Sequence, residues 1–312
     1  VEALNIDPEI KLILSGKQDV ISKELEKYQA DLSRIEILDA QDVIANDEQP
    51  TLAIREKKES SLVKGLYRLR EDADVSAMVS AGSTGAYLTG AMLIVGRLEG
   101  VDRPALAPVL PTLNFGHAML IDSGANMDCK PEYLAQFAVM GSAYMQAVHN
   151  IENPKVGLVS VGTEDEKGNA QTKAAFELLK KAPVNFAGNM EARDALSGEY
   201  DVLVADGFAG NVLLKSIEGT VNLIFSALKQ AINERALSKL GAALMKPSFK
   251  KLKDRLDYNK AGGAPFLGCK KIVIKTHGSS KAESIKAAVL QARTMAKMNL
   301  IEKIKNGIEK LI

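Results

Sequence analysis

The chain has 312 residues, of which 46% are hydrophobic, and its 40 lysines and arginines against 39 aspartates and glutamates leave a net charge of +1. This composition is typical of a folded protein with a sizeable core and excludes general disorder, and the balanced charge gives no reason to expect nucleic-acid binding. The two cysteines, Cys129 and Cys269, are too few and too far apart for a disulfide framework or a zinc motif, which suits a reducing cytoplasm, and no apolar run reaches the roughly 18 residues of a membrane span.

Short apolar strands alternate with helices along most of the chain. We expect strands at 11–14, 34–38, 75–80, 118–121, 156–161, 186–188, 201–205 and 272–275, with helices at 19–28, 61–71, from about 84, 132–148, 172–181, 211–228 and 280–300. Repeated β-then-α units predict an α/β protein with three α/β/α layers and a mostly parallel sheet. We expect one domain over 1–312. Because its first residues resemble the end of a helix, we also expect an opening strand to be missing.

Polar, glycine-bearing loops follow four of these strands. They are A-G-S-T-G (residues 81–85), G-T-E-D-E-K-G-N (162–169), D-G-F-A-G-N (206–211) and T-H-G-S-S (276–280). In a parallel sheet such loops share the carboxyl edge, where helix N-termini direct free N–H groups toward an anion. They predict a single anionic site, although any one loop could equally be a βα turn that only requires glycine.

Few residues offer other chemistry. GxSxG, HExxH, GxGxxG and P-loop patterns are absent, and no metal site is indicated. Lys275, His277 and Ser279 share one loop, and Lys173 lies in the first turns of a helix, where the dipole disfavours a cation unless a ligand lies in front of it. Asp206 could contribute to the ligand site or could cap a helix. The side chains of Asn126 and Asn211 could hydrogen-bond a ligand or merely favour turns.

Such a site suits a small oxyanion. If phosphate is itself the reactant, the enzyme needs no nucleophile of its own and must only desolvate phosphate, aim it at a carbonyl and stabilise the developing oxyanion. A thiolate leaving group needs little help from an acid.

Residues 230–260 break the α/β pattern and predict an inserted basic amphipathic helical hairpin. Leu237, Leu240 and Leu244 recur at helical spacing, and Pro247 is expected to break the helix. Contact with a membrane surface or an acidic partner is one interpretation, and a dimer-forming or core-packed hairpin is the other. The residues expected to make this contact are Lys246, Phe249, Lys250, Lys251, Leu252, Lys253, Arg255 and Leu256.

Six motifs occur in an order that closely resembles the acyl-[acyl-carrier-protein]:phosphate acyltransferases of bacterial phospholipid synthesis. They are S-A-G-S-T-G-A (80–86), I-D-S-G-A-N (121–126), G-T-E with G-N (162–164, 168–169), D-G-F-A-G-N (206–211), G-G-A-P-F-L-G (262–268) and K-T-H-G-S-S (275–280). The resemblance runs from about Lys11 to Leu300. Members of that family open with a strand and an Asp-Met-Gly-Gly-Asp turn, which this sequence lacks.

The resemblance implies a reaction in which phosphate takes the fatty acyl group from acyl-carrier protein to give acyl phosphate. A downstream membrane glycerol-3-phosphate acyltransferase would use this product. It further implies a homodimer, without cofactor, that is cytoplasmic but peripherally membrane-associated, in a fold related to phosphotransacetylases and isocitrate/isopropylmalate dehydrogenases. The hairpin would then contact lipid or the carrier protein.

The resulting site hypothesis assigns catalysis to His277, Lys173 and Asn211. Substrate and phosphate binding is expected from Gly82, Ser83, Thr84, Gly85, Asn126, Thr163, Asn169, Asp206, Gly207, Gly210, Lys275, Gly278 and Ser279. The alternatives are a phosphate acetyltransferase acting on acetyl-CoA, an NAD-dependent decarboxylating dehydrogenase and a non-enzymatic scaffold that binds a carrier protein or a membrane. The dehydrogenase would need metal-binding aspartates and an arginine cluster, and no such spacing is found.

Overall fold

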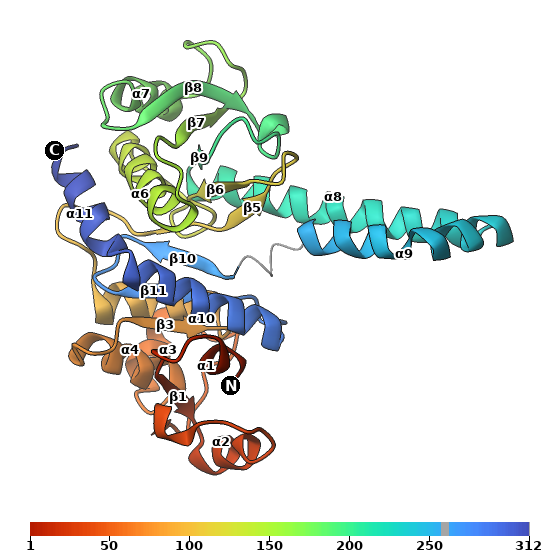
Figure 1. Ribbon diagram of the computed structural model, residues 1–312. Coiled ribbons are helices and arrows are strands. Elements are labelled where there is room, and N and C mark those ends of the chain that lie inside the picture. Colours follow the sequence, from red (N-terminus) through yellow and green to blue (C-terminus); the bar gives the residue numbers. More distant parts are fainter. Residues whose placement is uncertain (257–261, 312) are drawn as a thin grey trace.

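The computed structural model describes residues 1–256 and 262–311, with the side chains of 236 and 253–256 outside that description. Figure 1 shows a layered body with one long helical projection. The strands are β1 (Leu12–Gly16), β2 (Ile35–Asp39), β3 (Ala77–Ser80), β4 (Ala105–Leu106), β5 (Val109–Pro111), β6 (His117–Ile121), β7 (Lys155–Ser160), β8 (Asn185–Glu191), β9 (Val202–Val204), β10 (Ala264–Leu267) and β11 (Ile272–Lys275). The α-helices are α1 (Glu2–Ile6), α2 (Gln18–Leu25), α3 (Pro50–Glu56), α4 (Ser61–Glu71), α5 (Thr84–Gly90), α6 (Pro131–His149), α7 (Ala170–Leu179), α8 (Gly207–Asn233), α9 (Ala236–Leu256), α10 (Ala282–Lys297) and α11 (Leu300–Glu309).

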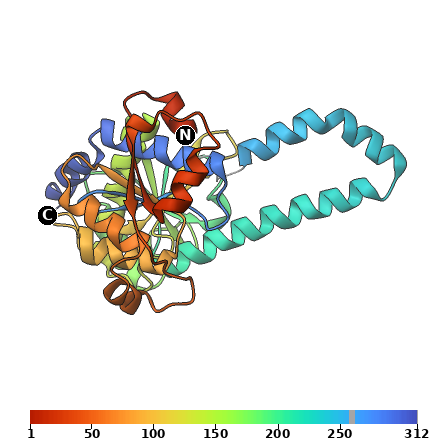
Figure 2. The same cartoon turned by 90° about the horizontal axis from the view of Figure 1, so that it is seen from below.

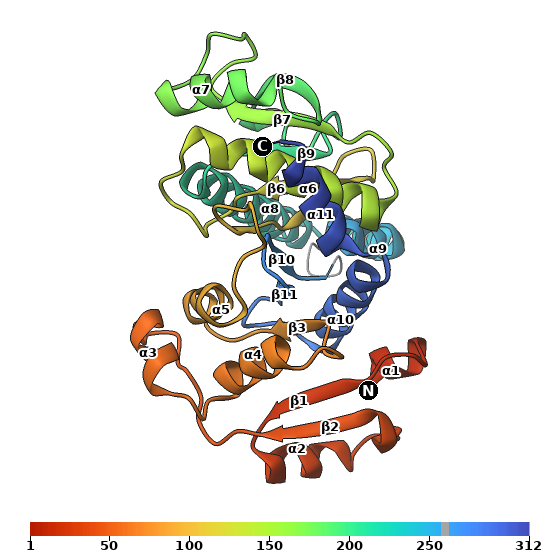
Figure 3. The same cartoon turned by 90° about the vertical axis from the view of Figure 1, so that its left-hand side faces the viewer.

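The strands form two main sheets and a separate pair. The sheets have the orders β3-β11-β10-β4 and β5-β6-β9-β7-β8, and β1 pairs with β2. The pairs β1–β2, β3–β11, β6–β9, β7–β9 and β7–β8 are parallel, whereas β4, β5 and β10 pair antiparallel. The expected mostly parallel α/β fold is therefore confirmed. Each set of parallel strands sends its loops to one edge, and Figure 3 shows α3, α5 and α7 on one side of the column of strands.

Alternating strand residues divide the interior into layers. In β11, Ile272 and Ile274 join a cluster with α6, α10 and α11, whereas Val273 joins a second cluster with α4 and α5. In β9, Val202 and Val204 also face the first cluster, and Leu203 packs in a third cluster with α8. Because successive strand side chains point to opposite faces, helices cover both sides of each sheet.

Helices α8 and α9 form the projection. Only the first turns of α8 are buried, at Gly207, Gly210 and Leu213, and the remainder extends from the body beside α9, with the two helices joined at their far end (Figure 2). The predicted break at Pro247 is wrong, because α9 runs through that residue as one helix. A proline removes one backbone hydrogen bond, and on an exposed helix water can satisfy the freed carbonyl.

Candidate functional site

The loops that follow β3 and β11 lie side by side. Ser80 and Lys275 are register partners, and Thr276 N donates a hydrogen bond of 2.9 Å to Ser80 O. Ser80 Oγ accepts from Gly82 N at 3.1 Å, and Ser83 is buried and caps α5 by accepting from Ala86 N. Gly82, Thr84 and Gly85 remain exposed beside this cap. The structure thus brings together the predicted residues 82–85 and 275–279.

Lys275 ends β11 as a nearly buried cation, only 8% exposed. Its Nζ donates to Thr276 O, and burial lowers the pKa of the ammonium. Among the ion pairs of the described side chains, none includes Lys275. A buried ammonium that lacks a counter-ion favours the arrival of an anion.

His277 lies exposed on the same loop. Its Nδ1 is 2.7 Å from Ser279 Oγ and accepts a hydrogen bond of 3.2 Å from Ser279 N. Since a backbone amide can only donate, Nδ1 is the acceptor, and the neutral ring carries its proton on Nε2. His277 therefore presents an Nε2–H donor that its own loop does not use.

The loop after β6 is organised by Asp122, a residue that the site hypothesis omitted. Its fully buried carboxylate accepts from Leu106 N at 2.9 Å, from Asn126 N at 2.6 Å and from Ala125 N at 3.1 Å. Burial raises the pKa of Asp122, and the hydrogen bonds from backbone amides act against that rise. An aspartate directly after a strand and before Ser-Gly was the available indication in the sequence, but its partners are fixed only by the fold.

Asn126 joins this loop to its neighbours. Its Nδ2 donates to Pro104 O and to the Asp122 carboxylate, and its carbonyl oxygen accepts from Gly207 N at 2.8 Å. The Nδ2 donor that we expected to serve a ligand is therefore engaged within the protein.

The start of α8 rests directly on that loop. A side chain at Gly207 would overlap Asn126 O, and one at Gly210 would overlap Asp122 O, so both positions require glycine. Asp206 caps α8 by accepting from Ala209 N at 2.7 Å, which is the capping role weighed for it. The Asn211 side chain lies against Gly124, at the edge of this junction.

Two side-chain amide groups hold the loop after β7 in place. Asn189 Nδ2 donates to Glu164 O at 2.8 Å, and Gln171 Nε2 donates to Cys129 O at 2.6 Å, which ties α7 to the segment after β6. Asn169 caps α7 by accepting from Thr172 N at 2.9 Å. Thr163 and Lys173 remain exposed near this cap.

The predicted residues thus fall into two groups, one around residues 82–85 and 275–279, the other around 126, 163–173 and 206–211. The segment that contains β4 connects them, because β4 pairs with β10 while Leu106 N binds Asp122. Ala125 also packs against the cluster that includes Ala86 and Tyr87 of α5. Within the described residues, no hydrogen bond or ion pair joins side chains of the two groups, and the links between them run through these intervening segments.

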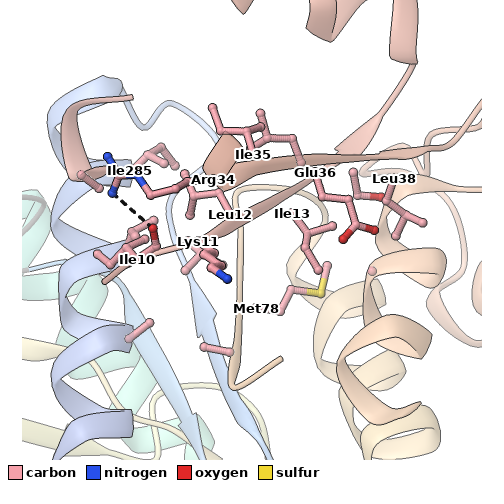
Figure 4. Close-up of a pocket in the computed structure, with 18 of the residues that line it drawn as sticks. Ile10, Lys11, Leu12, Ile13, Arg34, Ile35, Glu36, Leu38, Met78 and Ile285 are labelled. Carbon is pink, nitrogen blue, oxygen red and sulfur yellow. Dashed lines mark hydrogen bonds between the residues drawn. The ribbon is translucent and has the colours of Figure 1, made fainter. Parts of the chain in front are cut away.

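A cavity of about 1740 Å³ lies apart from most of these residues (Figure 4). It separates β1 and β2 from β3, α4 and α10, and Leu12, Ile13 and Ile35 give it aliphatic walls. It reaches Ser80 and Gly82, but His277, Asn211 and Lys173 do not line it. It also exceeds the roughly 300–1,000 Å³ of ordinary ligand pockets. We therefore place the candidate site at the loops, where the polar donors gather.

The projection of α8 and α9 carries the expected contact residues. Lys246, Lys250, Lys251 and Leu252 are exposed, Phe249 is half-buried, and the side chains of Lys253, Arg255 and Leu256 lie outside the described part. No helix in the described ranges is long and apolar enough to cross a bilayer. Exposed apolar side chains accompany the lysines on both helices, namely Leu223, Ile224, Leu228, Leu237, Leu240, Leu244 and Met245.

Comparisons with known proteins agree with this fold. A family model described as "Fatty acid synthesis protein" matches residues 1–303. The phosphate acyltransferase of Clostridium acetobutylicum is 48% identical over 311 residues, which cover 100% of this chain and 93% of the relative. That of Clostridium tetani is 47% identical over 308 residues, covering 99% and 92%.

Solved structures share the fold at low sequence identity. The EutD phosphotransacetylase from Staphylococcus aureus superimposes with a TM-score of 0.59 at 16% identity, covering 95% of this chain and 88% of that one. A phosphotransacetylase from Streptococcus pyogenes gives the same TM-score of 0.59 at 16% identity, with 95% and 89% covered.

Proposed function

Because the chain belongs to the phosphate acyltransferase family and is an acyltransferase, we propose that it moves a fatty acyl group from acyl-carrier protein to inorganic phosphate. The product would be an acyl phosphate for phospholipid synthesis. The proposal draws on the residues at the two loop groups for the chemistry and on the α8–α9 projection for the partners.

The observation that carries the proposal is the buried ammonium of Lys275 beside the loop of Ser80 and Gly82. Phosphate would supply the counter-ion that Lys275 lacks among the described side chains. The exposed Nε2–H of His277 would add a donor from the same loop. Both groups favour bound phosphate by charge and by hydrogen bonding.

The reaction needs no enzyme nucleophile. A phosphate oxygen attacks the thioester carbonyl carbon, the C–O bond forms, the C–S bond breaks, and the departing thiolate takes up a proton from solvent. The cysteines are poor competitors for that attack, because burial raises the pKa of Cys129 to about 11 and that of Cys269 further still. A thiol at such a pKa is almost entirely protonated near neutral pH.

The second group would serve the acyl donor. Asn211, at the junction of α8 with the loop after β6, would donate to the carbonyl oxygen as negative charge develops on it. Lys173, in the first turn of α7, would attract the anion from the other side. The network of Asp122 and Asn126 would keep the start of α8, and with it Asn211, in position.

The α8–α9 projection supports the choice of partners. Exposed Lys246, Lys250 and Lys251 suit an acidic carrier protein or anionic lipid head groups. Its exposed leucines suit burial against a membrane surface or a second copy of the chain. We propose a cytoplasmic, peripherally membrane-associated homodimer that passes acyl phosphate to a membrane glycerol-3-phosphate acyltransferase.

The test is phosphate-dependent thiol release. The purified protein is incubated with hexadecanoyl-acyl-carrier protein with and without inorganic phosphate, free thiol is followed with a chromogenic reagent, and acyl phosphate is trapped with hydroxylamine. We expect thiol and hydroxamate to appear in equal amounts, and only with phosphate. Faster reaction with acetyl-CoA would indicate a phosphate acetyltransferase, and no phosphate-dependent release from either donor would indicate a scaffold.

A further inference from the structure

Four large apolar side chains lie exposed at the carboxyl edge of the second main sheet. Met127, Val161, Phe208 and Val212 are 48, 79, 66 and 51% exposed, and we call them the apolar rim. They belong to the segments that follow β6, β7 and β9, which are neighbours in the sheet. An exposed apolar group of this kind commonly marks a binding surface.

A backbone contact joins two of the segments that carry the apolar rim. The hydrogen bond of 2.8 Å from Gly207 N to Asn126 O joins the segment that carries Phe208 to the segment that carries Met127. Val212 follows Phe208 by one turn of α8, on the side away from the buried Gly210 and Leu213.

Val161 reaches the same place from β7. Leu158 of β7 pairs with Val204 of β9, and Val161 follows the end of β7 at the same carboxyl edge where the segment after β9 leads into α8. The apolar rim therefore lies along one edge of the sheet, where three neighbouring segments contribute to it.

The apolar rim borders Asn211, one of the candidate donors of the site. Val212 follows Asn211 directly, and Met127 follows Asn126. A ligand that fits here has a polar head for Asn211 and an apolar tail for the apolar rim. A fatty acyl thioester has this two-part character, with its carbonyl at one end and its methylene groups at the other.

We propose that the apolar rim holds the first methylene groups of the donor's acyl chain, so that Phe208 and Val212 set the preference for long chains over short ones. This assignment rests on the proposed function and adds to it the part of the substrate that determines specificity. Each methylene group removed from water is worth about fourfold in affinity. A few methylene groups against Phe208 therefore account for a tenfold or larger preference.

The experiment compares hexadecanoyl- and acetyl-acyl-carrier protein as donors to inorganic phosphate. The measured quantity is the ratio of kcat/KM for the long donor to that for the short one. We expect Phe208→Ala to lower this ratio about tenfold, Phe208→Leu to retain most of it, and Phe208→Ala with Val212→Ala to lower it further. Leu113→Ala is the matched control, because Leu113 is also exposed but precedes the amino end of β6. An unchanged ratio in the folded variants would overturn the assignment.

A binding measurement separates this assignment from the proposed reaction. S-hexadecyl- and S-methyl-pantetheine are titrated against the wild-type and Phe208→Ala proteins by calorimetry. We expect the wild type to prefer the hexadecyl compound and the variant to lose that preference, whether or not phosphate accepts an acyl group. Equal binding of the two compounds to the wild type would refute the apolar rim as a chain site. If Phe208→Ala changes the molecular mass measured by light scattering and leaves the kcat/KM ratio of the two donors unchanged, the apolar rim would instead be assigned to contact between copies of the chain.

Discussion

The backbone amide of Gly207 donates a hydrogen bond of 2.8 Å to the carbonyl oxygen of Asn126 and so fastens the first turn of α8 to the loop after β6. The contact is possible because Gly207 and Gly210 bring the helix backbone against that loop without a side chain between them. The buried carboxylate of Asp122 holds the other side of the loop. These contacts hold the start of α8 and the loop after β6 together as one unit.

Gly210→Ala should destabilise the protein by about 2 kcal/mol or more, because the added methyl group overlaps the backbone oxygen of Asp122, which cannot rotate away. Gly219→Ala is the control on the same helix. No atom lies within 4 Å of the position of its new methyl group. Alanine should there stabilise the helix by about 0.5–1 kcal/mol. Urea unfolding measures the free energy of unfolding of both variants. Similar changes in the two would contradict the close packing at Gly210.

Lys275→Met should raise the KM for phosphate roughly tenfold or more, because a charge-assisted hydrogen bond worth about 1.5–3 kcal/mol is lost. Its thermal stability should not fall, since the substitution removes a buried charge without a carboxylate partner among the described residues. Lys271→Met should behave in the opposite way. Lys271 Nζ donates to Val75 O at 2.8 Å and to two further carbonyls, so its loss should lower the melting temperature and leave the KM for phosphate unchanged. Kinetics and thermal melts of the two variants distinguish the roles.

Acid should weaken the fold through His149. Burial, with a smaller contribution from His117 at a ring distance of 4.5 Å, lowers the pKa of His149 to about 4. The unfolded chain, with an ordinary histidine pKa near 6.5, then takes up the proton first. Stability from this residue is therefore present above about pH 6.5 and is lost as the pH falls toward 4.

With allowance for partial exposure, the loss should be about 2 kcal/mol. Urea unfolding at about pH 7.5 and about pH 5 measures it. His149→Gln should reduce the difference in the free energy of unfolding between these two pH values. An equally large difference in that variant would assign the acid sensitivity to other groups.

Leu244→Glu should reduce binding to vesicles of phosphatidylglycerol and phosphatidylethanolamine tenfold or more, because burying a leucine is worth about 1.5–3 kcal/mol. Leu244 is exposed on α9, which projects from the body of the protein (Figure 1). Turnover of soluble donors should therefore persist. Leu113→Glu, which places the same charge on the body of the protein, should float with vesicles as the wild type does. Unchanged flotation of Leu244→Glu would argue against lipid contact at this helix.

The helices and strands that were predicted most accurately are those determined by short stretches of sequence. The expected strand at 272–275 is β11, and the expected helix start at Thr84 is the first residue of α5. A run of β-branched residues and a serine cap act within a few residues, so sequence alone reveals them. The break predicted at Pro247 was wrong, because helix-forming residues on both sides keep α9 continuous through it.

Tertiary pairing decides what the sequence did not reveal. Asp122 binds Leu106 N, 16 residues away, and no local pattern indicates that partner. The two-residue strand β4 exists only because β10 lies beside it. The donors of Asn126 were expected to face a ligand, but the fold uses its Nδ2 for Pro104 and Asp122. Candidate residues could be named from the loops. Which of them are free to bind a ligand, and which hydrogen-bond within the protein instead, depends on contacts between distant segments.

The alternation along β11 has a consequence for its last residue. Lys275 occupies the face of Val273, two positions earlier, and not that of Ile272 and Ile274. Inserting or deleting a single residue within this strand would exchange the two interiors and turn the ammonium to the opposite side of the sheet. The length of β11 is thus as strict a requirement for anchoring an anion as the identity of the lysine that ends it.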